Sequence, residues 1–323
     1  MAIDILNIGP SVISRDLRGK YVLLYGKPKS GKTTAAVSFP KTLLCAFEKG
    51  YNAIGGVKAV DITKWSDFKL VLRQLESEAA RNMYETIIID TISIAWDLCE
   101  QFICGQNAVQ NISDIGWGKG YSAEKKEFEG ALRKITQLGY GVVLIAHNTT
   151  RIEKATDGSE YEIVAPDLPK RAAEICNGIV DIIGYIGNEY TDGEYKRWLY
   201  TRETPSLFAG SRFRYLAPKI EFGYQQLIDA IGDAIDEAEK HGAIVVDKME
   251  VKFEEKLDYK TLMDEARDLW TKLVIEPEDE DMARTIGKKI EMNFGHPMKL
   301  SEVTEDQVDI LNLVVMDMRD LLK

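Results

Sequence analysis

At 323 residues with 45% hydrophobic content, the chain can bury a large core and can hold two domains, or one domain with an appendage. No apolar run approaches the roughly 20 residues of a membrane helix, and no basic stretch followed by an apolar core begins the chain, so we expect a cytoplasmic protein with no membrane partner. The four cysteines form no Cys-x-x-Cys pair, which argues against a zinc site and a disulfide framework.

The net charge of −11 is unevenly distributed along the chain. Residues 224–323 hold 13 Lys+Arg against 25 Asp+Glu, a net charge of −12, whereas residues 1–223 hold 28 against 27, a net charge of +1. A nearly neutral first part with local basic clusters can still hold phosphate groups. The densest basic cluster consists of Lys196, Arg197, Arg202, Arg212, Arg214 and Lys219.

A strand, a glycine-rich loop and a helix are predicted in succession near the N-terminus. Residues 21–25 form a short apolar run, residues 26–33 match G-x-x-x-x-G-K-[ST], and a helix can open at Thr34. In this context the pattern predicts a phosphate-binding loop, in which Lys32 reaches the β- and γ-phosphates of ATP and Thr33 ligates Mg²⁺. The residues expected to contact the nucleotide are Gly26, Lys27, Pro28, Lys29, Ser30, Gly31, Lys32, Thr33 and Thr34.

The second predicted strand covers residues 42–47 and ends at Glu48. Open α/β sheets bind ligands at the carboxyl ends of their parallel strands, so Glu48 is placed to orient and deprotonate an attacking water. Its position alone is equally compatible with a solvated loop charge.

An amphipathic helix at residues 61–83 precedes a third strand, residues 85–90. An apolar run that ends in a carboxylate, here Asp90, is typical of a buried Walker B strand beside the Mg²⁺. We therefore expect Thr33 and Asp90 to be the metal-binding residues.

Residues 105–122 are rich in glycine and polar side chains and predict a mobile loop before a helix at residues 123–138. Within this loop, Trp117 and Tyr121 could stack on bases while Lys119 meets a phosphate, a composition that suits single-stranded nucleic acid. The alternative is that these aromatic side chains only anchor the loop.

Residues 140–146 predict another buried strand, which ends at His147. A polar side chain at this strand end can sense the γ-phosphate, or it can simply complete the hydrogen bonds of the strand end. The polar segment that follows, residues 149–169, carries Arg151 and Lys154 and predicts a hairpin.

Residues 179–186 and 195–201 predict a second, antiparallel hairpin that extends the sheet. Beyond it, residues 224–240 predict an acidic amphipathic helix and residues 241–257 a charged connector. Residues 258–323 predict two or three helices, the last of which opens at a capping box beginning with Thr304.

These motifs together resemble those of the RecA-like ATPases. The sequence Ala-Phe-Glu-Lys-Gly at 46–50 and the strand that ends in Ala146 and His147 are similar to the phage-encoded, shortened RecA-like family. Members of that family are associated with single-strand annealing and recombination. The resemblance covers residues 18–222.

The resemblance implies that Glu48 is the catalytic glutamate and that residues 105–122 and 149–168 are two DNA-facing loops. It also implies ATP and Mg²⁺ as cofactors, single-stranded DNA as a partner, and a homo-oligomer in the form of a ring or filament. A single-strand-binding protein or another replication or recombination protein would be a further partner, and the location would be the cytoplasm of the host cell. The positive charge that reaches the ATP of a neighbouring subunit would come from Arg202, Arg212, Arg214 and Lys219, with Arg202 and Arg212 as the catalytic candidates.

We therefore expect an α/β protein with a RecA-like P-loop NTPase core, a mainly parallel central sheet and a small C-terminal helical region. The expected boundaries are residues 1–223 for the ATPase core, 224–257 for a helix and connector, and 258–323 for the helical region. Two alternatives stay open: another P-loop enzyme, such as a small-molecule kinase, and a non-catalytic nucleotide-dependent scaffold.

Overall fold

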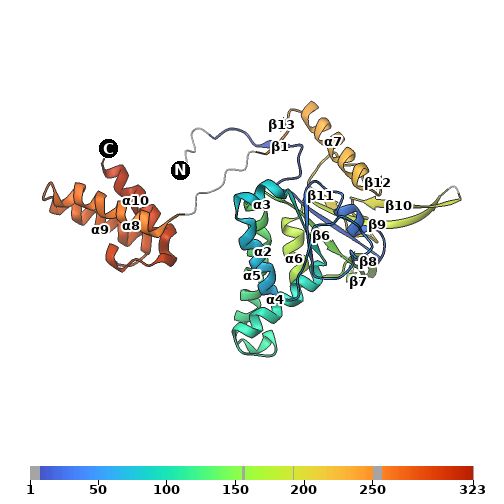
Figure 1. Ribbon diagram of the computed structural model, residues 1–323, viewed down its shortest axis with the longest axis horizontal. Helices are drawn as coiled ribbons and strands as arrows, with labels where there is room; N and C mark the ends of the chain where they lie inside the picture. Colours follow the sequence, from blue (N-terminus) through green and yellow to red (C-terminus); the bar gives the residue numbers. More distant parts are fainter. Residues whose placement is uncertain (1–7, 155–156, 192, 250–256, 323) are drawn as a thin grey trace. The chain divides into compact units, whose positions relative to one another are not determined.

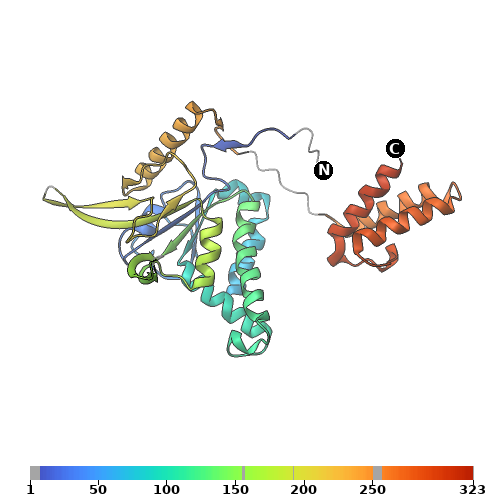
Figure 2. The same ribbon diagram turned by 180° about the vertical axis from the view of Figure 1, so that it is seen from behind.

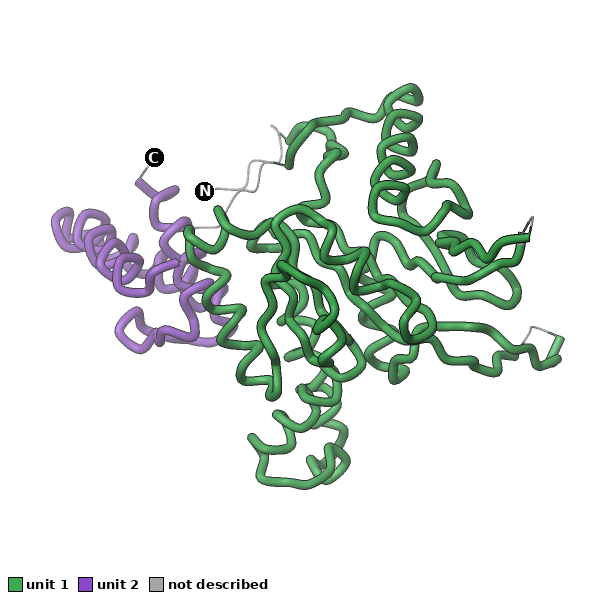
Figure 3. Tube along the Cα trace, turned by 45° about the vertical axis from the view of Figure 1, so that its right-hand side comes forward, with its two compact units in different colours: residues 1–253 green, residues 254–323 purple. Residues whose placement is uncertain are grey.

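The computed structural model describes residues 8–154, 157–191, 193–249 and 257–322. The chain forms two compact units, residues 1–253 and residues 254–323 (Figure 3). The first unit is longer than the expected core of residues 1–223, because helix α7 (Tyr224–Lys240) packs its apolar face on the sheet. Residues 250–256 of the expected connector lie outside the described residues.

The first unit is a mixed α/β structure. Its strands are β1 (Val12–Ser14), β2 (Tyr21–Gly26), β3 (Thr42–Ala46), β4 (Ala59–Asp61), β5 (Thr86–Asp90), β6 (Gly141–Ala146), β7 (Asn148–Lys154), β8 (Glu160–Pro166), β9 (Ile182–Thr191), β10 (Glu194–Tyr200), β11 (Gly210–Ser211), β12 (Lys219–Glu221) and β13 (Ile244–Val246). Its helices before α7 are α1 (Lys32–Ala36), α2 (Trp65–Leu75), α3 (Glu78–Met83), α4 (Ile92–Gln106), the 3₁₀ turn η2 (Ile112–Asp114), α5 (Lys119–Gln137) and α6 (Lys170–Ile179).

The central sheet has the strand order β12-β10-β9-β2-β6-β5-β3-β4, with β11 paired to β9. Strands β9, β2, β6, β5, β3 and β4 are parallel to their neighbours, and β10 turns back antiparallel on β9 as the expected closing hairpin. This sheet confirms the expected α/β fold with a mainly parallel central sheet. Because parallel strands end at the same edge, the residues that follow β2, β3, β5 and β6 meet there.

Side chains of the sheet alternate between two cores, as the period of two along a strand requires. In β2, Leu23 packs with α2, α4, α5 and α6 on one face, whereas Leu24 packs with α1 and α7 on the other. Figures 1 and 2 show these helices covering the two faces of the sheet. Since both neighbours of β2 are strands and both faces are covered, all its residues are buried.

The second unit has its own apolar core, to which its α-helices, Leu273 and Val303 contribute. Its elements are α8 (Tyr259–Trp270), the π-helical turn η3 (Thr271–Ile275), α9 (Glu280–Phe294), the 3₁₀ turns η4 (Leu300–Glu302) and η5 (Glu305–Gln307), and α10 (Val308–Leu321). The expected capping box is present: the backbone N–H of Thr304 donates to Oε1 of Gln307, 3.0 Å away, and η5 leads directly into α10. Among the helices of the described residues, none combines the length and the apolar character needed to cross a membrane.

Candidate nucleotide-binding site

The phosphate loop lies between the end of β2 at Gly26 and the start of α1 at Lys32. A Cβ atom on Gly26 would lie 2.7 Å from the carbonyl oxygen of Ile186 in β9, so only glycine fits at this strand end. Gly31 precedes α1 with φ +91°, in the left-handed region that glycine adopts without strain. Packing therefore requires glycine at position 26, and the backbone conformation favours it at position 31.

Lys32 is buried, and its ammonium group lies inside the loop. Nζ donates to the carbonyl oxygens of Gly26 and Lys27, at 2.8 Å each. Burial lowers the pKa of Lys32, whereas the carboxylates of Asp90 and Glu48 raise it. The loop thus holds a cation at its centre, where a phosphate-binding loop needs one.

Thr33 and Asp90 are in direct contact, although 57 residues separate them. The Thr33 hydroxyl donates to Oδ2 of Asp90 at 2.7 Å. Burial raises the pKa of Asp90, and the hydrogen bond from Thr33 opposes that rise. Hydroxyl and carboxylate oxygens suit Mg²⁺, which usually takes one or two protein oxygens together with water and substrate phosphates. Among the described residues no group of three or more His, Cys, Asp or Glu forms a metal cage. The pair therefore fits a Mg²⁺ ion that is shared with a nucleotide.

Glu48 lies beside this pair because the end of β3 is tied to the end of β5. The backbone N–H groups of Phe47 and Glu48 both donate to the carbonyl oxygen of Asp90, at 2.7 and 2.9 Å. The Glu48 carboxylate is half-exposed, and its Oε2 lies 3.3 Å from Nε2 of His147 at the end of β6. Within the described part of the chain, Nδ1 of His147 is buried without a partner. The structure thus brings Lys32, Thr33, Glu48, Asp90 and His147 to one edge of the sheet.

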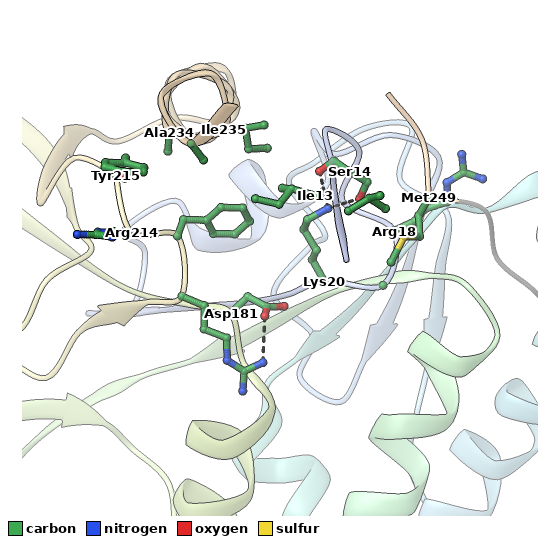
Figure 4. A pocket seen from close by; sticks show the side chains of 15 residues that line it. Ile13, Ser14, Arg18, Lys20, Asp181, Arg214, Tyr215, Ala234, Ile235 and Met249 are labelled. Carbon is green, nitrogen blue, oxygen red and sulfur yellow. Dashed lines mark hydrogen bonds and ion pairs between the residues drawn. The ribbon is translucent and has the colours of Figure 1, made fainter. Parts of the chain in front are cut away.

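The two arginines expected to be catalytic, Arg202 and Arg212, make contacts outside the phosphate loop of their own chain. Arg212 pairs with Oδ1 of Asp181 at 3.1 Å, and Oδ2 of Asp181 accepts from the backbone N–H of Tyr21. Because Tyr21 begins β2 and Gly26 ends it, Arg212 lies at the edge of the sheet opposite to the phosphate loop. There it lines a cavity of about 320 Å³ beneath α7, where Figure 4 shows the dashed contact to Asp181. Arg202 donates to backbone carbonyl oxygens, including that of Arg214 at 2.6 Å, and so braces residues 213–216.

Another arginine of the same basic cluster, Arg197 of β10, lies against the phosphate loop of its own chain. A Cβ atom on Gly31 would lie 3.1 Å from Nη1 of Arg197. The sequence puts Arg197 in the basic cluster but indicates no role for it, because its position depends on how the hairpin of β9 and β10 pairs with β2. One feature of the sequence does bear on it: side chains alternate along a strand, so Arg197 and Leu199 lie on the same face of β10.

Half of the stretch expected to be a mobile loop, residues 105–122, lies in helices. Helix α4 continues to Gln106, the turn η2 follows, and α5 begins at Lys119 rather than near residue 123. A Cβ atom on Gly120 would lie 2.6 Å from the carbonyl oxygen of Ile112, so this glycine permits close packing of η2 on α5. The loop is therefore shorter at both ends than expected and is interrupted by η2, because Gly105 and Gly120 lie within helices.

The aromatic residues expected to meet DNA differ in their surroundings. Trp117 is 100% exposed between η2 and α5, and Lys119 is exposed beside it. Tyr121 is partly buried, and the Arg171 guanidinium lies 3.6 Å from its ring centroid in a cation–π contact. Trp117 is therefore the member of this group that is free to stack on a base.

The basic residues of the expected hairpin are β7 residues in a pair with β8. Arg151 donates to the carbonyl oxygen of Pro166 at 3.0 Å and to that of Leu168. Lys154 is exposed and lies 3.6 Å from Glu160; residues 155 and 156 lie outside the described part. Figures 1 and 3 show the β7–β8 hairpin and the turn between α4 and α5 on different sides of the first unit, so the two groups are not brought together.

The chain matches one protein-family model and is similar to a prophage-derived protein. A family model described as an AAA domain (AAA_24) matches residues 18–213. The SPbeta prophage-derived uncharacterized protein YorG of Bacillus subtilis (strain 168) is 31% identical over 339 residues, covering 100% of this chain and 99% of the relative.

Two solved structures show a weaker similarity. The KaiC-like protein PH0186 of Pyrococcus horikoshii OT3 has a TM-score of 0.36 and 16% identity, covering 64% of this chain and 85% of that one. The flagellar accessory protein FlaH of Methanocaldococcus jannaschii has a TM-score of 0.35 and 13% identity, with the same coverage. The family model, by contrast, spans more than half of the chain and includes the phosphate loop, Glu48, Asp90 and His147, so the chain belongs to the AAA domain family (AAA_24).

Proposed function

We propose that the protein is a Mg²⁺-dependent ATPase. The observation that carries the proposal is the 2.7 Å contact between Thr33 and Asp90, since it joins the phosphate loop to the Walker B strand. A hydroxyl and a carboxylate that meet beside a buried lysine are the groups needed to hold MgATP. Bound there, Mg²⁺ would neutralise negative charge on the β- and γ-phosphates.

Each side chain of the site has a separate role in this proposal. Lys32 binds the β- and γ-phosphate oxygens, and Thr33 and Asp90 hold the metal ion. Glu48 orients the attacking water and takes its proton. His147, 3.3 Å from Glu48, holds that carboxylate in position and senses the γ-phosphate.

We further propose that ATP hydrolysis serves work on single-stranded DNA in phage recombination, annealing or replication. Three observations support this: the resemblance to the phage RecA-like family, the prophage-derived relative that matches the whole chain, and the fully exposed Trp117. A homo-oligomer, as a ring or filament, and a single-strand-binding protein as partner belong to the same proposal. The kinase alternative would need an acceptor pocket beside the phosphate loop, and the cavity of Figure 4 lies at the opposite edge.

The test is the ATPase rate of the full-length protein with and without a single-stranded oligonucleotide. We expect Mg²⁺-dependent hydrolysis that the oligonucleotide stimulates, and Lys32→Ala should abolish nearly all of it because the loop loses its central cation. Lys126→Ala, at an exposed lysine of α5, is the matched control and should keep its activity. Near-normal turnover by Lys32→Ala would overturn the ATPase proposal, and no response to the oligonucleotide would overturn the DNA proposal.

A further inference from the structure

The pairing of β10 sets the height of Arg197 relative to the phosphate loop. Gly26, the last residue of β2, pairs with Ile186 of β9, and Ile186 pairs with Leu199 of β10. Arg197 pairs with Asn188, two residues further along β9. Since β9 continues past the end of β2, Arg197 lies beyond that end, at the level of the loop.

The face of the sheet on which Arg197 lies follows from alternation along β10. Leu199 packs in the core that contains residues of α1 and α7. Two residues along a strand return to the same face, so Arg197 projects to the face on which α1 begins. Its neighbour Lys196 projects to the other face.

The Arg197 side chain lies against the loop backbone with an aromatic ring beside it. A Cβ atom on Gly31 would lie 3.1 Å from Nη1 of Arg197 and 3.5 Å from Cε1 of Phe222. The backbone N–H of Phe222 donates to the carbonyl oxygen of Arg197 at 3.0 Å, which joins the two residues. The backbone of Phe222 is thus tied to that of Arg197, and both side chains reach Gly31.

Within the described residues the Arg197 guanidinium has no hydrogen-bond or ion-pair partner, and its side chain is exposed. Other cations of the basic cluster are engaged: Lys219 with Glu189, Arg212 with Asp181, and Arg202 with carbonyl oxygens. An unpaired guanidinium beside a phosphate-binding loop has a fork of donors that matches phosphate oxygens.

We propose that Arg197 binds phosphate oxygens of the nucleotide held by the phosphate loop of its own chain. The inference rests on the proposed function and deepens it, because it adds a second cation to the site and places it in the same subunit. Arg197 is then a nucleotide-binding residue on the face of the sheet that carries α1. It differs from the arginines expected to act between subunits, because it serves the nucleotide of its own chain.

The test measures the affinity of the full-length protein for a fluorescent, non-hydrolysed ATP analogue at two salt concentrations. Arg197→Ala should weaken binding roughly 10- to 100-fold, the usual size for a charged hydrogen bond, and the remaining affinity should depend less on salt. Arg197→Gln, which keeps the first methylene groups of the side chain but removes the charge, should show the same loss, and Arg197→Lys a smaller one. Lys196→Ala, on the opposite face, is the matched control and should bind like the wild type.

Equal affinity and equal salt dependence of Arg197→Gln and Lys196→Ala would overturn the inference while leaving the ATPase proposal intact. Failure of the wild type to bind the analogue would overturn the proposed function instead.

Mixing Arg197→Ala with Lys32→Ala distinguishes an arginine that acts in its own chain from one that acts on a neighbouring subunit. If Arg197 acts in its own chain, no mixed site is complete, and hydrolysis stays low at ATP concentrations below the Kd of Arg197→Ala. Restored hydrolysis would show that Arg197 serves a neighbouring subunit and would overturn the inference.

Discussion

At the scale of single residues, Glu48 should separate turnover from nucleotide binding. Glu48→Gln keeps the size of the side chain but removes the basic oxygen, so we expect ATP binding to persist while turnover falls by roughly 10²- to 10⁴-fold, the usual contribution of a general base. Steady-state hydrolysis and analogue binding, measured on the same preparation, check this. Normal turnover in Glu48→Gln would mean that the base lies elsewhere and that Glu48 is a solvated loop charge.

At the scale of elements, the packing of α5 against α4 and α6 contains a buried carboxyl group, Glu124. Its side chain is fully buried, and among the described residues neither carboxylate oxygen has a hydrogen-bond partner. Nη1 of Arg171 on α6 lies 3.9 Å from Oε2. Burial, together with Glu100 and Asp97 of α4, raises the pKa of Glu124 to about 7, and Arg171 opposes this rise.

This raised pKa makes the stability of the first unit depend on pH. An ordinary glutamate titrates near 4.5, so between pH 4.5 and about 7 the folded chain holds a proton that the unfolded chain has lost. The free energy of unfolding therefore falls as pH rises through this window, by at most about 3 kcal/mol. Glu124→Gln should remove the penalty, and so stabilise the protein at pH 8 with little change near pH 4.5.

Urea unfolding at the two pH values measures this effect. Glu129→Gln, a partly buried residue of the same helix that pairs with Arg133, is the control and should leave the difference between the two pH values close to that of the wild type. If Glu124→Gln and the wild type respond equally to pH, the Glu124 carboxyl group is not the source of the dependence.

At the scale of the whole molecule, all the proposed nucleotide-site residues lie in the first unit, while residues 254–323 hold 10 Lys+Arg against 18 Asp+Glu. A protein ending at residue 253 should therefore keep its ATPase activity and bind single-stranded DNA more tightly, because a segment of charge −8 no longer repels phosphates.

Titration of a labelled oligonucleotide against both proteins at two salt concentrations checks this prediction. Trp117→Ala in the shorter protein should cost roughly 1–3 kcal/mol of binding free energy if the ring stacks on a base. Tighter binding by the full-length chain would instead make the second unit a DNA-contacting module.

Those parts of the site that depend on local sequence could be predicted, and those that depend on strand register could not. The phosphate loop and Asp90 each follow a recognisable strand, so their shared edge could be inferred from the parallel order. The roles of Arg197 and Arg212 could not, because the pairing of β10 with β9 and the position of the chain after β11 are set by distant residues. The start of α5 was expected too late because glycine occurs both in loops and where two elements pack closely, as Gly120 does against Ile112.

Strand β2 leads into the phosphate loop, and both strands that pair with it come much later in the sequence. It pairs with β6 and β9, and β6 begins at Gly141, 115 residues after Gly26. A ribosome that adds roughly 5–20 residues per second needs about 6–23 s to cover that distance. For this interval the apolar residues 21–25 emerge as an unpaired segment of a nascent chain. The yield of the protein in a cell should therefore depend on chaperones that shield this segment, and slowing translation between residues 26 and 141 should favour aggregation over folding.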